Sequence, residues 1–161
     1  MEHQLNVISP CGNVGYGITG FNIIKCLVEQ GIDVCLSTVR PDLQRSGEDL
    51  AFIEPLCKKF NDSFFHDSPC LVLWHQFQLQ TSVGRGNYYA WPIFELNKFT
   101  EIEKHQLKYP DHIIVCSNWA HSIIDSEIGR FANIIPLGVD RSIFNPAKYQ
   151  QNNGTQDKTI F

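Results

Sequence analysis

The stretch that decides the fold is Asp111-His-Ile-Ile-Val-Cys-Ser-Asn-Trp-Ala-His121, which is followed by Asn133-Ile-Ile-Pro136. The continuous apolar run 113–116 predicts a strand that is covered on both faces of a parallel sheet. Ser117 stands where a helix N-cap belongs, apolar residues then recur at helical spacing, and Gly129 predicts the end of that helix. The apolar pair before Pro136 predicts a short strand. Such a crossover unit turns its polar first loop toward the sheet edge where α/β proteins bind ligands.

The same alternation of strands and helices runs through the rest of the chain. Apolar runs predict strands at 5–8, 34–38, 71–74 and 88–94, and helical periodicity predicts helices at about 21–31, 48–60 and 100–108. Pro55 is expected to interrupt or bend the second helix, and Pro92 is unusual within a strand. Thr100 and Glu103 have the spacing of a capping box. The pattern predicts an α/β fold with a Rossmann-like, doubly wound parallel sheet.

Composition limits the class of protein. The chain has 161 residues, of which 43% are hydrophobic and 19% charged, enough for one well-buried core. A net charge of -4 without a basic run argues against a nucleic-acid partner. No apolar run reaches the length of a membrane span, and the N-terminus lacks a signal-peptide pattern. We therefore expect a cytoplasmic protein without evident membrane association.

Six cysteines are scattered through the sequence without a Cys-x-x-Cys pair, at positions 11, 26, 35, 57, 70 and 116. Most fall in apolar segments, so buried and reduced thiols are expected in place of disulfides or a metal site. The six histidines are also dispersed, without a His-x-x-x-His pair. We expect no bound metal.

A glycine-rich segment, Pro10-Cys-Gly-Asn-Val-Gly-Tyr-Gly-Ile-Thr-Gly20, lies between the first predicted strand and the first predicted helix. Glycine lets a ligand approach the backbone closely, and the following helix offers free N–H groups to an anion. Gly12, Gly15, Tyr16 and Gly17 are therefore candidates for binding a phosphate or a sugar. A glycine-rich turn without a ligand remains an alternative.

Residues 15–20 also match the dinucleotide fingerprint G-x-G-x-x-G. In that fingerprint the first glycine follows the strand almost directly, whereas Gly15 lies well beyond Ile8. The second predicted strand ends in Thr38-Val-Arg40, without the acidic residue that would hold a ribose. Because Arg40 would suit a 2'-phosphate, an NADP site stays open.

Two further candidates follow the third predicted strand. His75 comes directly after it, where an imidazole can orient a sugar hydroxyl or transfer a proton near neutral pH. It would serve equally well as a hydrogen-bonded histidine beneath a loop. Arg85 lies in a polar loop, where it would close over an acidic acceptor or a phosphate, unless it is an ordinary surface charge.

The region 115–146 resembles the end of the N-terminal domain of retaining GT-B glycosyltransferases of family 4. The family's "v-S-x-w" and "viP-x-GvD-x-x-x-F-x-P" patterns match here at Val115, Ser117, Trp119, Ile135, Pro136, Gly138, Val139, Asp140, Phe144 and Pro146. The segment Trp91-Pro-Ile-Phe-Glu95 resembles a "w-x-x-f-E" pattern found in a subset of the same proteins. The resemblance implies an acceptor-side Rossmann-like domain at 1–147. Residues 148–161 would then be a linker and the first residues of a missing donor-binding domain.

The resemblance implies a transferase that moves a sugar from a nucleotide-sugar donor to an unidentified acceptor, without a cofactor or a metal. His75 and Glu95 would position groups at the interdomain cleft, and the glycine-rich loop would contact phosphate or acceptor. Glu95 could instead cap the next helix or pair with Lys98, and Ser117 could bind ligand or only cap its helix.

The donor would be held mainly by the missing domain, so we expect this chain to fold without transferring sugar. Its exposed interdomain face would favour self-association. A free-standing sugar-phosphate binding module and an NADP-dependent oxidoreductase remain as alternative functions.

Overall fold

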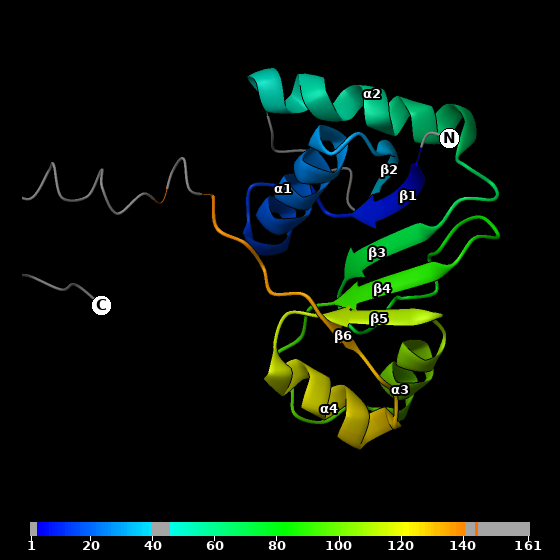
Figure 1. Cartoon of the computed structure of the whole chain (residues 1–161), viewed down its shortest axis with the longest axis vertical. Helices are drawn as coiled ribbons and strands as arrows, with labels where there is room; N and C mark the ends of the chain where they lie inside the picture. Colours follow the sequence, from blue (N-terminus) through cyan, green and yellow to red (C-terminus); the bar gives the residue numbers. More distant parts are fainter. Residues whose placement is uncertain (1–2, 40–45, 141–143, 145–161) are drawn as a thin grey trace, which may run out of the picture.

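The computed structural model describes residues 3–39, 46–140 and 144 of the chain. In this part of the chain, six parallel strands form one sheet accompanied by four helices, which is a Rossmann-like α/β fold (Figure 1). The strands are β1 (Gln4–Ser9), β2 (Asp33–Thr38), β3 (Cys70–Trp74), β4 (Tyr88–Pro92), β5 (His112–Val115) and β6 (Asn133–Ile134). The helices are α1 (Gly15–Glu29), α2 (Gly47–Ser63), α3 (Glu101–Lys108) and α4 (Asn118–Ile128).

The predicted alternation of strands and helices is confirmed, and so are the predicted caps of α3 and α4. Ser117 caps α4, because its hydroxyl accepts a hydrogen bond from the amide of Ala120 at 3.1 Å. Gly129 follows that helix with a φ of 64°, a conformation that glycine adopts without strain. Thr100 and Glu103 form the expected capping box at the start of α3.

Three local expectations differ from the structure. α1 begins at Gly15, so the second half of the glycine-rich segment is helical and does not belong to a loop. Pro55 lies inside α2 without ending it, because the fully buried Ile53 fixes the helix beside it and packing outweighs the propensity of proline. Pro92 is the last residue of β4, where a missing N–H costs little, and the strand ends there.

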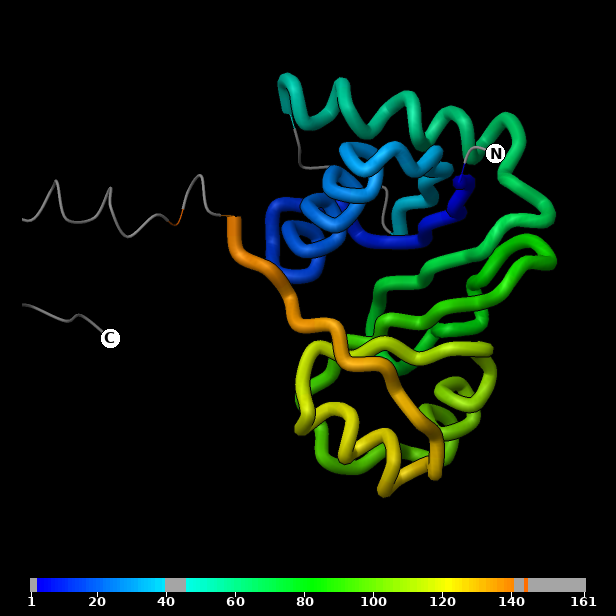
Figure 2. Tube along the Cα trace, viewed as in Figure 1, coloured from blue at the N-terminus to red at the C-terminus, as the bar shows by residue number. Residues whose placement is uncertain are grey.

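Neighbouring residues of β1 show how the two faces of the sheet are covered. Val7 packs in a buried cluster with Ile24 of α1. Ile8 points the other way and belongs to a second buried cluster with Leu107 of α3 and Ile124 of α4. Successive strand residues face opposite sides, so α1 covers one face and the last two helices cover the other. Figure 2 shows α1 and α2 near β1 and β2, with α3 and α4 at the other end of the sheet.

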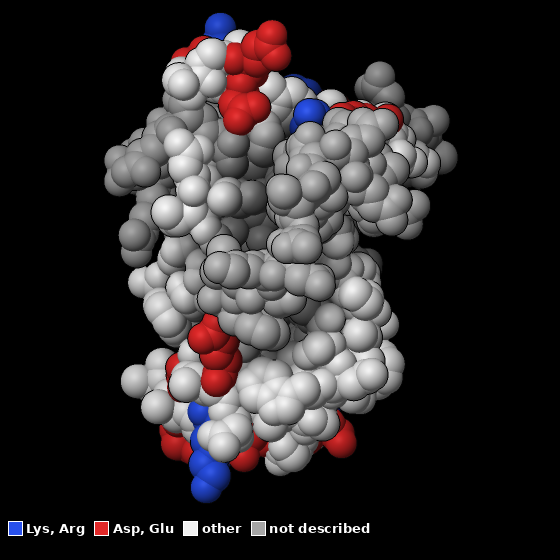
Figure 3. All heavy atoms as spheres, turned by 90° about the vertical axis from the view of Figure 1, so that its left-hand side faces the viewer, with Lys and Arg blue, Asp and Glu red and all other residues white. Residues whose placement is uncertain are grey.

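The order of the strands, β2-β1-β3-β4-β5-β6, reverses direction at β1. Ile8 has Ser37 of β2 as its register partner on one side and Val72 of β3 on the other. In α/β sheets such a reversal leaves a crevice between the carboxyl ends of the two central strands. We call the side where the strands end the carboxyl edge and the opposite side the amino edge. The carboxyl edge points to the left in Figure 1 and toward the viewer in Figure 3.

Other expectations concern single features. The expected linker at 148–161 and Arg40, the partner expected for a 2'-phosphate, lie outside the described residues. The six cysteines are free thiols, and Cys11, Cys35 and Cys70 are buried. Within the described ranges, none of the helices combines the length and the hydropathy that crossing a bilayer would require.

Candidate functional site

Four aromatic side chains meet at the carboxyl edge, where the strand order reverses. His75 follows β3, and its ring centroid lies 4.5 Å from that of Tyr16 in the first turn of α1. The ring of Trp74, at the end of β3, lies 4.8 Å from His75. Phe77 stacks on His75 at 5.0 Å with an interplanar angle of 5°. The imidazole is therefore held among three rings, which restrict its orientation.

Glu95 follows β4 and lies close enough to Tyr16 for its charge to act on the phenol. Burial, and then the negative charge of Glu95, raise the pKa of Tyr16 above its ordinary value. The hydroxyl of Tyr16 thus stays protonated at neutral pH and can donate a hydrogen bond, whereas the carboxylate of Glu95 can only accept one. The rings of Tyr16 and His75 are thus in contact, and the charge of Glu95 acts on Tyr16 from a third connection of the sheet.

The glycines of the first turn have two different roles. A Cβ atom on Gly17 would lie 2.4 Å from the backbone of Gly12, and one on Gly20 would lie 2.1 Å from the hydroxyl oxygen of Ser9. Both glycines therefore allow α1 to pack directly against the turn that precedes it. A Cβ atom on Gly15 would have nothing within 4 Å. Packing explains Gly17 and Gly20, and it leaves the space around Gly15 open.

The partial positive charge at the start of α1 is not compensated by side chains of that helix. Its N-cap is Val14, which is 73% exposed and whose side chain cannot accept a hydrogen bond from the first turn. No acidic side chain lies in that turn. The positive end of the helix dipole is therefore not neutralised by the helix's own side chains, an arrangement that suits an anionic group.

The turn that carries His75 is fixed by α3. Gln76 is buried and donates a hydrogen bond to Glu103 at 2.7 Å, and Gln106 accepts one from the amide of Leu79 at 2.9 Å. Partial burial raises the pKa of Glu103, but hydrogen bonds from the Thr100 amide, Gln76 and the Thr100 hydroxyl leave it below its ordinary value. Sequence reasoning missed Gln76 and Gln106, because no local pattern distinguishes them from exposed loop glutamines.

Arg85 lies away from this cluster. It sits at the amino edge, shortly before β4, and its guanidinium pairs with Asp67 at 3.1 Å, with both side chains mostly exposed. The structure does not bring Arg85 to the carboxyl edge, so the expectation that it closes over a ligand there is not retained. Ser117 does lie at the carboxyl edge, after β5, and its hydroxyl is engaged in capping α4.

Exposed apolar side chains are frequent in the connections that leave the carboxyl ends of the strands. They include Val14, Ile18, Phe77, Leu96, Trp119, Ile135, Leu137 and Val139. In the described segments between a strand's carboxyl end and the helix or strand that follows, the Lys and Arg residues are Lys98 and, at the amino edge, Arg85. Figure 3 shows charged side chains toward the upper end and in the lower half of this edge, and the described surface between them is largely uncharged.

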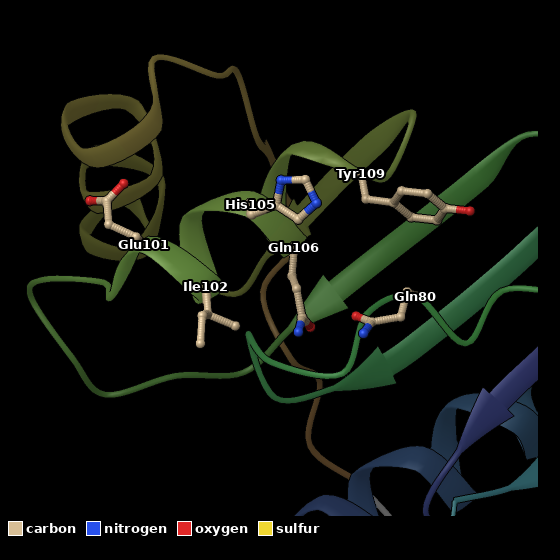
Figure 4. Close-up of a pocket in the computed structure, with 6 residues that line it drawn as sticks. All are labelled: Gln80, Glu101, Ile102, His105, Gln106 and Tyr109. Atoms are coloured by element: carbon tan, nitrogen blue, oxygen red, sulfur yellow. The ribbon is translucent and has the colours of Figure 1, made fainter.

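Two pockets lie near these elements. One, of about 480 Å³, opens at the carboxyl ends of β1, β2 and β3 and includes Trp74 in its wall. The other, of about 550 Å³, lies on α3 and is lined by Gln80, Glu101, Ile102, His105, Gln106 and Tyr109. Figure 4 shows Gln80 facing the helix and the carboxylate of Glu101 directed away from the other side chains. The first pocket adjoins the aromatic cluster and therefore belongs to the candidate site.

Comparison of the chain with known protein families gives no match, and no significant match is found among curated proteins.

Proposed function

We propose that the chain is the acceptor-side part of a retaining glycosyltransferase, which moves a sugar from a nucleotide-sugar donor to an acceptor hydroxyl. The observation that carries the proposal is the contact between Tyr16 and His75 where the strand order reverses, and the charge of Glu95 also acts on Tyr16. The resemblance of 115–146 to glycosyltransferases of family 4 supports the same function. A cytoplasmic location remains a prediction from sequence.

The three side chains suit the positioning of a sugar. The imidazole of His75 is oriented by its neighbouring rings and can exchange a hydrogen bond with an acceptor hydroxyl. Tyr16 can donate a hydrogen bond and Glu95 can accept one, so together they provide a donor and an acceptor for the hydroxyl groups of a sugar. In the resembled family the donor's leaving phosphate helps to deprotonate the acceptor, without a metal. These side chains would accordingly hold the acceptor in place.

The donor would be held mainly by a second α/β domain. The open start of α1, with Gly12 and Gly15, would contact a phosphate of the donor or of the acceptor. We therefore expect the 161-residue chain to fold but not to catalyse transfer. The exposed apolar side chains of the carboxyl edge would be covered by that domain, or would favour self-association in its absence.

The test is a transfer assay with radiolabelled nucleotide sugars and a mixture of acceptors. The 161-residue chain is expected to give no labelled product, whereas a natural protein that carries this chain and a second α/β domain is expected to give product. Turnover by the 161-residue chain alone would contradict the division of the active site. Absence of product with the longer protein, across all nucleotide sugars, would contradict the proposed function.

The open start of α1 also suits a second candidate, a module that binds a sugar phosphate without chemistry. Such a module would bind glucose 1-phosphate near Gly15, and no longer form of the protein would transfer sugar. The NADP hypothesis has less support. Gly15, the first glycine of the fingerprint, already belongs to α1, whereas the dinucleotide fingerprint needs that glycine in the turn before the helix.

A further inference from the structure

The pocket of about 480 Å³ at the ends of β1, β2 and β3 is lined by aromatic, aliphatic and uncharged polar residues. The residues that line it include two aromatic ones, Phe60 and Trp74, and three that carry hydroxyls, Ser37, Thr38 and Thr81. None of the described residues that line it is charged. Its volume is in the range of ordinary small-molecule sites, about 300–1,000 Å³.

The hydroxyl of Ser37 is available to a ligand. Ser37 shares a face of the sheet with its register partner Ile8, and both line the pocket. No described residue offers the hydroxyl of Ser37 a hydrogen-bond partner, and the side chain is only partly buried. The described wall therefore combines open hydrogen-bonding groups with aromatic surface.

Trp74 connects this pocket with the aromatic cluster. Its ring lies 4.8 Å from His75 and 6.2 Å from Tyr16, and it also forms part of the pocket wall. Its indole N–H donates a hydrogen bond to the side-chain oxygen of Gln78 at 3.2 Å, which fixes the ring in this position. A ligand that fills the pocket therefore reaches the side chains of the proposed acceptor site.

We infer that the pocket binds an uncharged sugar unit of the acceptor, adjacent to the unit whose hydroxyl is held by His75. A sugar ring has a C–H face that packs on an aromatic ring and a rim of hydroxyls that both donate and accept hydrogen bonds. Proteins hold a phosphate with arginine, lysine or a helix N-terminus, and the described wall contains none of these. The acceptor is accordingly a neutral saccharide of two or more units. The assignment of this sugar to the acceptor rests on the proposed function. The binding of a neutral sugar in the pocket does not depend on it.

The test is titration of the isotope-labelled chain with maltose, cellobiose and lactose, with glucose 1-phosphate as the charged comparison. At least one neutral disaccharide is expected to shift the indole N–H signal of Trp74 and the amide signals of Ser37 and Thr38. Ser37→Ala is expected to weaken that binding by about 5-fold to 10-fold, the loss of one hydrogen bond. The matched control is Ser126→Ala, because Ser126 is exposed on α4 and lies outside the pocket; its variant should bind as the unchanged chain does.

The inference is overturned if no neutral disaccharide shifts these signals, if Ser37→Ala binds as tightly as the control, or if glucose 1-phosphate alone binds in the pocket. The outcome for the proposed function is separate. Disaccharide binding here without transfer by any longer protein would keep the inference and contradict the transferase. Transfer to a phosphorylated acceptor, without disaccharide binding, would contradict the inference and keep the transferase.

Discussion

The two edges of the sheet are built from similar residues with different partners. At the amino edge, Asn6 is fully buried; its side chain donates to the carbonyl of Phe65 at 2.8 Å and accepts from the amide of Phe65 at 2.9 Å. Arg130 donates hydrogen bonds to the carbonyl oxygens of Leu107, Lys108, Pro110 and Asp111. Polar groups at this edge hold the chain together, so they contribute mainly to stability.

At the carboxyl edge, by contrast, several side chains are left open to solvent. Phe77 stacks on His75 and is 38% exposed, the hydroxyl of Ser37 has no described partner, and Val14 leaves the start of α1 without a side-chain cap. Groups of this kind contribute little to the fold and are available to a ligand. The difference teaches that substitutions of the paired polar groups at the amino edge should change stability, whereas substitutions of the open groups at the carboxyl edge should change binding.

The largest effect is expected for Asn6→Ala. The change leaves the amide and the carbonyl of Phe65 without their partner, which should lower the free energy of unfolding by about 2–3 kcal/mol in urea denaturation. Asn22→Ala, at an exposed position of α1, is the control and should change stability by less than about 0.5 kcal/mol. Equal stabilities for the two variants would contradict the stabilising role of the polar groups at the amino edge.

Gly17→Ala should have the next largest effect, because it tests packing within the carboxyl edge itself. The new Cβ atom would lie 2.4 Å from the backbone of Gly12, so α1 or the preceding turn must move, at a cost of about 1–3 kcal/mol. Gly15→Ala meets open space and should leave thermal stability nearly unchanged. A loss of phosphate or sugar binding in Gly15→Ala, without a loss of stability, would support a role in binding for the open groups of the carboxyl edge. Similar melting temperatures for both variants would contradict the packing role of Gly17.

Arg130→Ala should lower the free energy of unfolding by about 1–2 kcal/mol, since four hydrogen bonds to the end of α3 and to the connection that follows it are lost. Arg85→Ala makes the same change at an exposed ion pair with Asp67, where less than about 1 kcal/mol is expected. Denaturant titration of both variants measures the difference. If Arg85→Ala weakened sugar binding while Arg130→Ala left stability unchanged, the assignment of both arginines to the amino edge's scaffold would be wrong.

The smallest effect concerns the charge at the carboxyl edge. Glu95→Gln removes a negative charge that raises the pKa of Tyr16, so that pKa should fall. Burial still acts on the phenol, and only part of the elevation should disappear. NMR titration of labelled tyrosine carbons between neutral and alkaline pH measures the change, with Glu101→Gln as the control. An unchanged pKa in Glu95→Gln would mean that Glu95 and Tyr16 do not share one site.

Helix ends and strand positions could be predicted because local patterns specify them. The capping box of Thr100 and Glu103 and the stop at Gly129 are each set by residues a few positions apart. The start of α1 could not be predicted in the same way. Gly17 and Gly20 suggest a loop in the sequence, yet they lie inside a helix, where the close approach of the preceding residues 9–12 leaves no room for a Cβ atom.

The candidate site was predictable to the extent that it follows strand ends. His75 and Glu95 each come shortly after a strand, and the parallel sheet brings such positions to one edge. Arg85 illustrates the limit, since the connection from β3 returns to the amino edge and the sequence does not mark where it turns back. Ser37 and Gln76 were missed because their significance depends on partners or cavities formed by remote segments.

The central claim is that the carboxyl edge holds the reacting sugar while the amino edge only supports the fold. The most direct measurement compares His75→Ala with His112→Ala in the sugar-transfer reaction of the longer protein, because His112 lies at the start of β5 on the amino edge. We predict that His75→Ala lowers the transfer rate by about 100-fold with little change in stability, whereas His112→Ala transfers sugar at the unchanged rate. Equal transfer rates for the two variants would contradict the claim.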